Sequence, residues 1–175
     1  VKIDVQLDQP HTFTLYLRVP GWCEYRMVIV NGKVVRGRSE NGYIAITREW
    51  QTGDAVELAM DMPVRLVAAN PNVRQMVGRV AIQRGPVVYC LEAADNPIAP
   101  LDRIVLKWSV EYRPELLGGV SVLRGTVKAM ETPPADGLYA PAKSAHYTPA
   151  EVTAVPYCVW DNREPGEMRV WFRGR

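Results

Sequence analysis

Apolar and polar residues alternate along most of the chain, which is the pattern of half-buried β-strands. In residues 13–19 every second side chain is apolar, and similar alternation recurs in residues 2–8, 56–62 and 104–113. Because successive side chains of a strand point to opposite faces, a period of two places one apolar row against a core. No window of about 11 residues holds a convincing helical period without Gly or Pro. The pattern therefore predicts an all-β protein.

Turn sequences separate these predicted strands and suggest how they pair. Asn31-Gly32 stands between residues 27–30 and 33–35, and Asn41-Gly42 leads into residues 43–47. An Asn-Gly pair favours a two-residue hairpin because both central residues of that turn need positive φ. We therefore predict an antiparallel β-meander, folded as a β-sandwich or jelly-roll-like structure.

A proline-containing segment predicts a division into two small β-sandwich units. Residues 93–101 contain two prolines and show no periodicity, as is typical of linkers. We expect a first β-sandwich domain at 1–95, a linker at 96–101 and a second β-sandwich domain at 102–175. The second domain carries a Pro-rich excursion at 131–149, and the sequence leaves open whether this domain is complete.

Composition and charge restrict the possible partners. Hydrophobic residues make up 47% of the chain and charged residues 23%, as in ordinary globular proteins. A net charge of +2 gives no electrostatic basis for binding nucleic acid or an anionic membrane. No apolar run approaches the roughly 18 residues that span a bilayer, and no secretory leader is evident. The chain starts at Val1 almost inside a strand pattern, so we expect a piece of a longer polypeptide. The compartment stays open, with the cytoplasm slightly favoured.

Short motifs in a fixed order connect the chain with one family. They are VPGW (19–22), VNG (30–32), GYIAITREW (42–50), GDAVEL (53–58), MPVRL (62–66), RGPVVYCLE (84–92), ELLGG (115–119) and PYCVWDNREPGEMRVW (156–171). The ordered set resembles the region after the catalytic barrel in glycoside hydrolase family 127, the β-L-arabinofuranosidase-like proteins. The resemblance implies a non-catalytic C-terminal β region that packs against an upstream (α/α) barrel of the same polypeptide. A homodimer and a carbohydrate are further partners that the resemblance leaves open.

Cysteine spacing bears on whether the family's chemistry is present. Members of the resembled family use a zinc-held cysteine nucleophile, with a glutamate and further cysteines, two of them adjacent, in the barrel. Cys23, Cys90 and Cys158 are widely separated, so no catalytic residue, cofactor-binding residue or metal ligand carries over to this chain. We expect no enzyme activity from the chain alone and zinc only in the barrel. We interpret the three cysteines as free buried thiols.

Acidic residues offer no recognisable catalytic pair. Glycoside hydrolysis normally needs two carboxyl groups about 5 to 9 Å apart across a sugar. The candidates lie at turns or at outward positions of alternating strands, and we interpret them as solvated surface groups. They are Asp54, Glu57, Asp61, Glu92 and Asp95.

Aromatic residues near turns are the remaining candidates for a functional site. Four of them could stack on a sugar or contact another domain; they are Trp22, Tyr25, Tyr43 and Trp50. Burial is the more frequent fate of large aromatics: Trp50 and Tyr43 would then cover the sandwich edge, and Trp22 would pack at a domain junction. We expect Trp160 and Trp171 to lie in the core.

Two functions are compatible with this sequence. The first is an accessory region that packs against the missing barrel, and the alternative is an independent carbohydrate-binding module. A binding module would present a planar row of exposed aromatic rings. A packing domain would present an apolar patch of several hundred Å².

Overall fold

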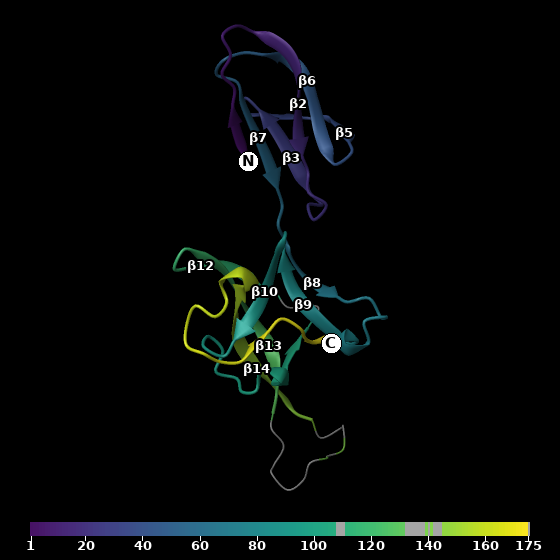
Figure 1. Ribbon diagram of the computed structural model, residues 1–175, viewed down its shortest axis with the longest axis vertical. Coiled ribbons are helices and arrows are strands. Elements are labelled where there is room, and N and C mark those ends of the chain that lie inside the picture. Colours follow the sequence, from purple (N-terminus) through teal and green to yellow (C-terminus); the bar gives the residue numbers. More distant parts are fainter. Residues whose placement is uncertain (108–110, 132–138, 140, 142–144, 175) are drawn as a thin grey trace. The chain divides into compact units, whose positions relative to one another are not determined.

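The computed structural model describes residues 1–107, 111–131, 139, 141 and 145–174, and it divides the chain into two compact units (Figure 1). Unit 1 is Val1–Pro63 and unit 2 is Val64–Arg175. The described residues are mainly strands, with short 3-10 helices at Arg74–Met76, Leu101–Arg103 and Tyr157–Val159. The all-β prediction is confirmed. Among the residues described, no helix is long and apolar enough to cross a membrane.

Unit 1 is built from two antiparallel sheets. One has the strand order β1-β7-β3-β4 and the other β2-β6-β5. The strands are β1 (Lys2–Asp4), β2 (His11–Arg18), β3 (Arg26–Val30), β4 (Lys33–Val35), β5 (Arg38–Glu40), β6 (Tyr43–Trp50) and β7 (Ala55–Met60). One apolar core joins residues of both sheets, which makes the unit a β-sandwich.

The core of unit 1 follows the alternation in the sequence. Leu17 and Ile46 point inward from one sheet, and Val28 and Val56 from the other. Trp50 is fully buried among them, and its indole Nε1–H donates to the Phe13 carbonyl oxygen at 3.1 Å. This hydrogen bond satisfies the polar atom of the ring, so the whole side chain can be buried in the core.

The Asn31-Gly32 hairpin forms between β3 and β4 as predicted. Both residues have positive φ, 51° and 76°, and the flanking strands pair from Val30↔Lys33. The Asn31 side chain donates to Asp54 Oδ1 at 2.6 Å and accepts from the Ala55 amide at 2.8 Å. This turn is thereby tied to the turn that precedes β7.

Unit 2 is a larger sheet that closes on itself. The strand order is β15-β10-β14-β13-β11-β16-β9-β8, with an additional pairing of β9 and β10 that closes the ring and with β12 attached to β13. Its strands are β8 (Val64–Ala68), β9 (Arg79–Arg84), β10 (Val87–Glu92), β11 (Ile104–Leu106), β12 (Arg113–Leu117), β13 (Val120–Met130), β14 (Tyr147–Pro156), β15 (Met168–Arg169) and β16 (Phe172–Gly174). The β11–β16 pair is parallel, and the other pairings are antiparallel among the residues described.

The predicted boundary between the units is wrong. Strands β9 and β10 pair with β16 and β14, so residues 79–92 belong to the second unit rather than to a domain ending at 95. The predicted linker at 96–101 lies inside unit 2, where Asn96 and Leu101 are buried. The boundary falls at Pro63–Val64 instead. Prolines without periodicity indicate an irregular segment, but they do not distinguish a linker from a buried connection.

The core and the periphery of unit 2 differ in burial. Leu91, Ile104, Leu123 and Phe172 are fully buried inside the ring. Every residue of β12, in contrast, is exposed. Of the predicted excursion at 131–149, residues 132–138, 140 and 142–144 lie outside the described part of the chain, and 147–149 begin β14.

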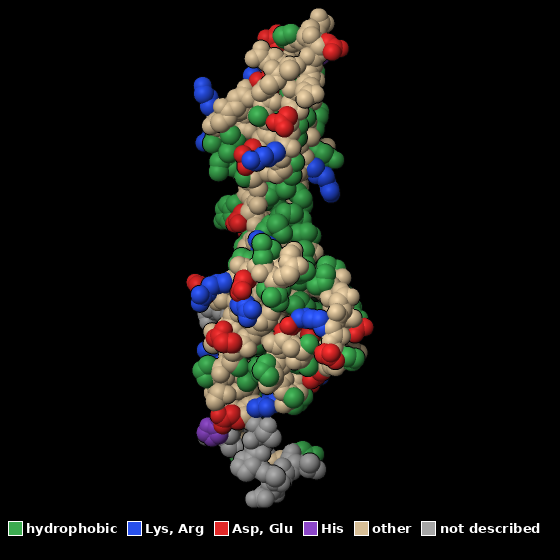
Figure 2. All heavy atoms as spheres, turned by 90° about the vertical axis from the view of Figure 1, so that its left-hand side faces the viewer, with side chains coloured by type: hydrophobic (Ala, Val, Ile, Leu, Met, Phe, Trp, Pro, Cys, Tyr) green, Lys and Arg blue, Asp and Glu red, His purple; other side chains and the backbone are tan. Residues whose placement is uncertain are grey.

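Surface charge agrees with the small net charge. On the side of the molecule in Figure 2, basic and acidic side chains are interspersed over both units, and neither sign forms a bank. This side therefore provides no electrostatic basis for recognising a polyanion.

The positive φ of Gly32 provides a test of the hairpin. At Gly32 an added Cβ would meet nothing within 4 Å, but φ is +76°, so Gly32→Ala costs backbone strain alone. We expect a loss of about 1–2 kcal/mol in the free energy of unfolding, measured by urea denaturation. Gly21 has equally open space and no left-handed φ, so Gly21→Ala is the matched control and should leave stability nearly unchanged. Equal urea midpoints for the two variants would contradict the left-handed conformation of Gly32 in this turn.

Candidate functional site

The four predicted aromatics do not form a single row. Trp50 is buried in the core and Trp22 is partly buried. Tyr25 is exposed just before β3, whereas Tyr43 begins β6 in the other sheet. The Tyr43 ring meets Tyr16 edge-on, with centroids 6.5 Å apart and planes at 84°. Unit 1 therefore does not present these rings as one flat platform.

A second aromatic pair lies in unit 2, at a position where the sequence suggested core. The rings of Tyr157 and Trp160 stack with centroids 6.0 Å apart and planes at 16°, and they are 44% and 39% exposed. The prediction that Trp160 lies in the core is wrong, and Trp171 is only partly buried. Pro156 ends β14 just before this pair, which is the sequence signal for a turn that carries both rings outward.

Tyr157 of this pair borders a surface hollow of about 720 Å³. Its lining is mostly apolar, with two arginines and one glutamine: Gln75, Met76, Arg79, Val88, Tyr157, Met168, Arg169, Val170 and Trp171. Asp102 lies 3.6 Å from Arg79 and 2.8 Å from Arg169. Glu167 also pairs with Arg169 at 2.9 Å, so two carboxylates compensate the two arginines and the hollow has no uncompensated charge with which to select an ionic ligand.

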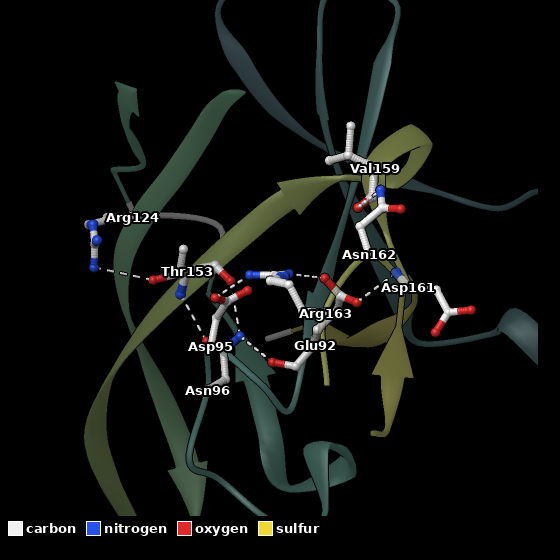
Figure 3. A network of polar contacts seen from close by, with 9 residues as sticks. All are labelled: Glu92, Asp95, Asn96, Arg124, Thr153, Val159, Asp161, Asn162 and Arg163. Atoms are coloured by element: carbon white, nitrogen blue, oxygen red, sulfur yellow. Dashed lines mark hydrogen bonds and ion pairs between the residues drawn. The ribbon is translucent and has the colours of Figure 1, made fainter. Parts of the chain in front are cut away.

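Buried polar groups cluster where β10 ends (Figure 3). Arg163 forms ion pairs with both Glu92 and Asp95. The other oxygen of Glu92 accepts from the Asp161 amide at 3.0 Å, and Asp161 has a positive φ of 62°. We call these four residues the Arg163 clamp. It fixes the loop after β14 to the end of β10.

The Arg163 clamp changes the interpretation of the acidic residues. Glu92 is 7% exposed, so the prediction of a solvated surface carboxylate is wrong for it. Hydrogen bonds and charge from Asp95, and then from Glu92, hold the pKa of Arg163 above its usual value. A glycosidase pair needs one carboxyl poised to donate a proton and another facing the sugar. Glu92 and Asp95 are instead committed to one guanidinium, an arrangement that orders a loop.

Asp54 is also buried, contrary to the sequence interpretation. Its carboxylate accepts from the Asn31 side chain at 2.6 Å and from the Gln51 amide at 3.0 Å. These two bonds, with a smaller effect of the Arg48 charge, hold the pKa of Asp54 below its usual value. Of the other candidates, Asp61 is exposed and Glu57 is partly buried. The signal that sequence reasoning lacked was the partner, since Asn31 is 23 residues away.

The cysteines remain separate in the structure. Cys23 and Cys90 are buried as predicted, but Cys158 is exposed. Burial, and then the neighbouring charge of Glu92, raises the pKa of Cys90 to about 12, so this residue stays a thiol and is unsuited to nucleophilic attack or metal binding. Within the described ranges, no group of three or more His, Cys, Asp and Glu could hold a metal ion. The confinement of zinc to another domain stays a prediction.

Sequence comparison separates the chain at the same place as the structure. A model of the glycoside hydrolase family 127 C-terminal domain matches residues 64–173, and one of the β-L-arabinofuranosidase GH127 middle domain matches residues 1–62. The chain belongs to glycoside hydrolase family 127. These two matches coincide with units 1 and 2, so each unit of this family 127 chain corresponds to one domain of the family.

Known family 127 proteins agree with this assignment. The chain is 38% identical over 168 residues to a non-reducing end β-L-arabinofuranosidase of Bifidobacterium longum subsp. longum, covering 90% of this chain and 25% of that protein. The crystal structure of a GH127 β-L-arabinofuranosidase from Geobacillus stearothermophilus T6 superposes with a TM-score of 0.89 at 36% identity, covering 99% of this chain and 28% of the other. A further GH127 β-arabinofuranosidase gives a TM-score of 0.79 at 32% identity, over 99% of this chain and 29% of that one. The chain thus spans about a quarter of the length of these relatives.

The Arg163 clamp predicts a large effect of removing its cation. Arg163→Ala would leave the nearly buried Glu92 without its partner, and we expect a loss of about 1–3 kcal/mol in the free energy of unfolding, below the value for fully buried pairs because Arg163 is partly exposed. Arg38 forms a comparable pair with Glu40 at an exposed site, so Arg38→Ala is the control and should cost less than about 1 kcal/mol. A loss in the free energy of unfolding for Arg163→Ala as small as that for Arg38→Ala, measured by urea denaturation, would contradict a stabilising role of the clamp.

Asp54 predicts a specific acid sensitivity. Because its pKa is lower in the folded state, its contribution to stability is fully present above the ordinary aspartate value of about 3.9 and is lost as pH falls through the lower folded value. We expect the urea midpoint of the wild-type protein to fall between pH 5 and pH 3 by more than that of Asp54→Asn, since the asparagine cannot titrate. Measuring both midpoints across this range tests the assignment, and parallel curves would contradict it.

Proposed function

We propose that this chain is the non-catalytic accessory β region of a glycoside hydrolase related to β-L-arabinofuranosidases. The observation that carries the proposal is the coincidence of units 1 and 2 with a middle and a C-terminal domain of family 127. The relatives are about four times as long, which leaves ample length for a separate catalytic domain. The region would position and stabilise that domain rather than act on the sugar.

The chemistry of the described residues supports a non-catalytic role. Glu92 and Asp95 are held by Arg163, and Asp54 is held by Asn31 and Gln51. Acid–base catalysis needs a carboxyl group that can reach the substrate and exchange its proton there. These buried carboxylates are engaged in contacts that order turns and loops instead.

The partner in this proposal is an (α/α) barrel upstream in the same polypeptide. The family resemblance implies that zinc and the cysteine nucleophile belong to that barrel. A role of the β region in homodimerisation is a further part of the proposal. Cys90, with its raised pKa and complete burial, is unsuited to serve as such a nucleophile.

A second candidate function rests on the exposed pair Tyr157 and Trp160. Tyr157, which stacks on Trp160, lines a hollow that includes Gln75, and an aromatic ring beside a polar side chain is the combination that sugars use. This favours weak carbohydrate binding by unit 2 as the alternative, in place of the row of unit 1 aromatics. A lone stacked sugar should bind with a Kd of around 1 mM, measurable by calorimetry with arabinose.

Activity measurements test the accessory role. We expect the chain alone to release no chromophore from an aryl β-L-arabinofuranoside above a control without protein, because it supplies no positioned acid, base or nucleophile. A polypeptide that includes the preceding catalytic domain should hydrolyse the same substrate. Clear turnover by the chain alone would contradict the accessory role, and micromolar sugar binding would favour the binding module.

A further inference from the structure

The two outer faces of unit 1 differ in chemistry. The strand pairing places Met27 opposite Ala59 and Ile29 opposite Val34 on the outer side of the sheet β1-β7-β3-β4, because their neighbours Val28 and Leu58 point into the core. Tyr25 lies just before the start of β3. We call these five residues the outer apolar face. Glu57, Lys2 and Asp4 continue the same side of the sheet toward its edge at β1. Tyr25, Val34 and Met27 are 72%, 67% and 46% exposed.

The opposite sheet presents a more polar exterior. On β2 the inward positions are Phe13, Leu15 and Leu17, so Thr12, Thr14, Tyr16 and Arg18 point outward. On β6 the outward positions include Thr47 and Glu49, and Thr14 and Thr47 hydrogen bond to each other at 2.7 Å. Hydroxyls and charges that bond to one another and to water need no cover. The exposed apolar side chains of this sheet are Tyr16 and Tyr43, whose rings meet edge-on. Among the described strand residues of unit 1, the exposed large aliphatic side chains are Met27 and Val34, both on the other sheet, and exposed aliphatic side chains that lie together are typical of an interaction surface.

Shape supports the same conclusion. A shallow hollow of about 310 Å³ lies at one end of the outer apolar face. Its lining includes Tyr25, Met27 and Ala59, with Arg26 and Asp61 at its border. A protruding apolar side chain of a partner could enter this hollow while the flanking charges orient it, which is the anatomy of a packed core with a polar rim.

The place of β1 indicates which partner covers the face. β1 forms the edge of this sheet by pairing with β7, and the Val1 amino group bonds the Leu58 carbonyl oxygen at 2.8 Å. Unit 1 corresponds to a domain described as the middle one in the family, so another domain precedes it there. A polypeptide that enters unit 1 from that preceding domain does so through β1, at the edge of the sheet that bears the outer apolar face.

We propose that the outer apolar face of unit 1 is the surface on which the preceding catalytic domain of the same polypeptide docks. The inference rests on the proposed accessory function and adds which of the two sheets makes the contact. Burial of aliphatic and aromatic side chains supplies the stabilisation, and attachment through β1 keeps the effective concentration of the two domains high. The occupant is therefore an apolar surface of that domain rather than a sugar.

Thiol labelling distinguishes the two sheets. In a Cys158→Ser background, which removes the exposed native thiol, Met27→Cys and Val34→Cys report on the outer apolar face. Thr12→Cys and Thr47→Cys report on the opposite sheet and are the matched controls. Each variant is made both in the present chain and in a polypeptide that includes the preceding domain, and its rate of reaction with a maleimide is measured.

We expect Met27→Cys and Val34→Cys to react rapidly in the present chain and about tenfold or more slowly in the longer polypeptide, where reaction requires local opening. The control thiols should react at the same rate in both. If only the control thiols react more slowly in the longer polypeptide, the contact lies on the opposite sheet. This result would overturn the inference and leave the accessory function intact. Slow reaction of Met27→Cys in the present chain would mean that the outer apolar face is already covered there. If dilution restores the rate, the cover is a second copy of the chain; if it does not, the cover is part of the chain itself. Either result overturns the inference. The accessory function is tested separately: it fails if the present chain alone hydrolyses the aryl β-L-arabinofuranoside.

Discussion

A single buried amide continues the pairing of two strands where the backbone ladder of unit 2 stops. Strand β10 pairs with β14 from Tyr89 to Leu91, and the chain then turns away. The Asn96 side chain takes over by accepting from the Thr153 amide at 2.8 Å and donating to the Thr153 carbonyl oxygen at 3.0 Å. Because a side-chain amide has a donor and an acceptor like a peptide group, both backbone groups of Thr153 are satisfied in the interior. The turn that carries Glu92 and Asp95 to Arg163 depends on this replacement.

The motif at 156–171, one of those that resemble the family, has a structural role in this arrangement. Glu167 accepts from the Leu101 amide at 2.7 Å and from Arg169 at 2.9 Å, while Arg163 holds the end of β10. An added Cβ at Gly166 would approach the Ala93 side chain to 3.2 Å, so the backbone passes close to its neighbour there. Several residues of one motif thus bond to a segment some 70 positions earlier. A motif can identify a family through such contacts without taking part in its chemistry.

Local features of the fold could be predicted from the sequence, and features that depend on distant partners could not. Alternation identified the inward rows that include Leu17 and Val56, because the period of a strand is a property of the strand itself. The Asn31-Gly32 turn was predictable for the same reason. The burial of Glu92 was not, since it depends on Arg163, 71 residues later. The domain boundary was misplaced because Asn96 lies in a proline-containing segment whose composition resembles a linker.

The candidate site follows the same division. Exposure of Tyr25 and Tyr43 agrees with their positions near turns, whereas Trp50 lies at the end of a long strand and faces inward. Hydrophobicity alone favoured a core position for Trp160, but the 3-10 turn after Pro156 carries it outward. Which side of a sheet remains uncovered is a property of the assembled sandwich, so the outer apolar face could be recognised only from the pairing register.

The exposed strand β12 has a consequence for solubility. Among the described strands it pairs with β13 alone, so its other edge presents backbone amides and carbonyls to which a further strand could bond, and the exposed Leu116 and Leu117 add apolar surface there. However, Pro114 removes one donor from that edge, and Arg113 and Glu115 bring charge to it; Glu115 is held by Arg124 at 2.7 Å. Proline and charge at an edge discourage a second chain from extending the sheet. The pairing of β9 and β10 closes the ring but leaves β8 and β15 at its margin, so the protection of β12 against strand addition comes from its own proline and charges.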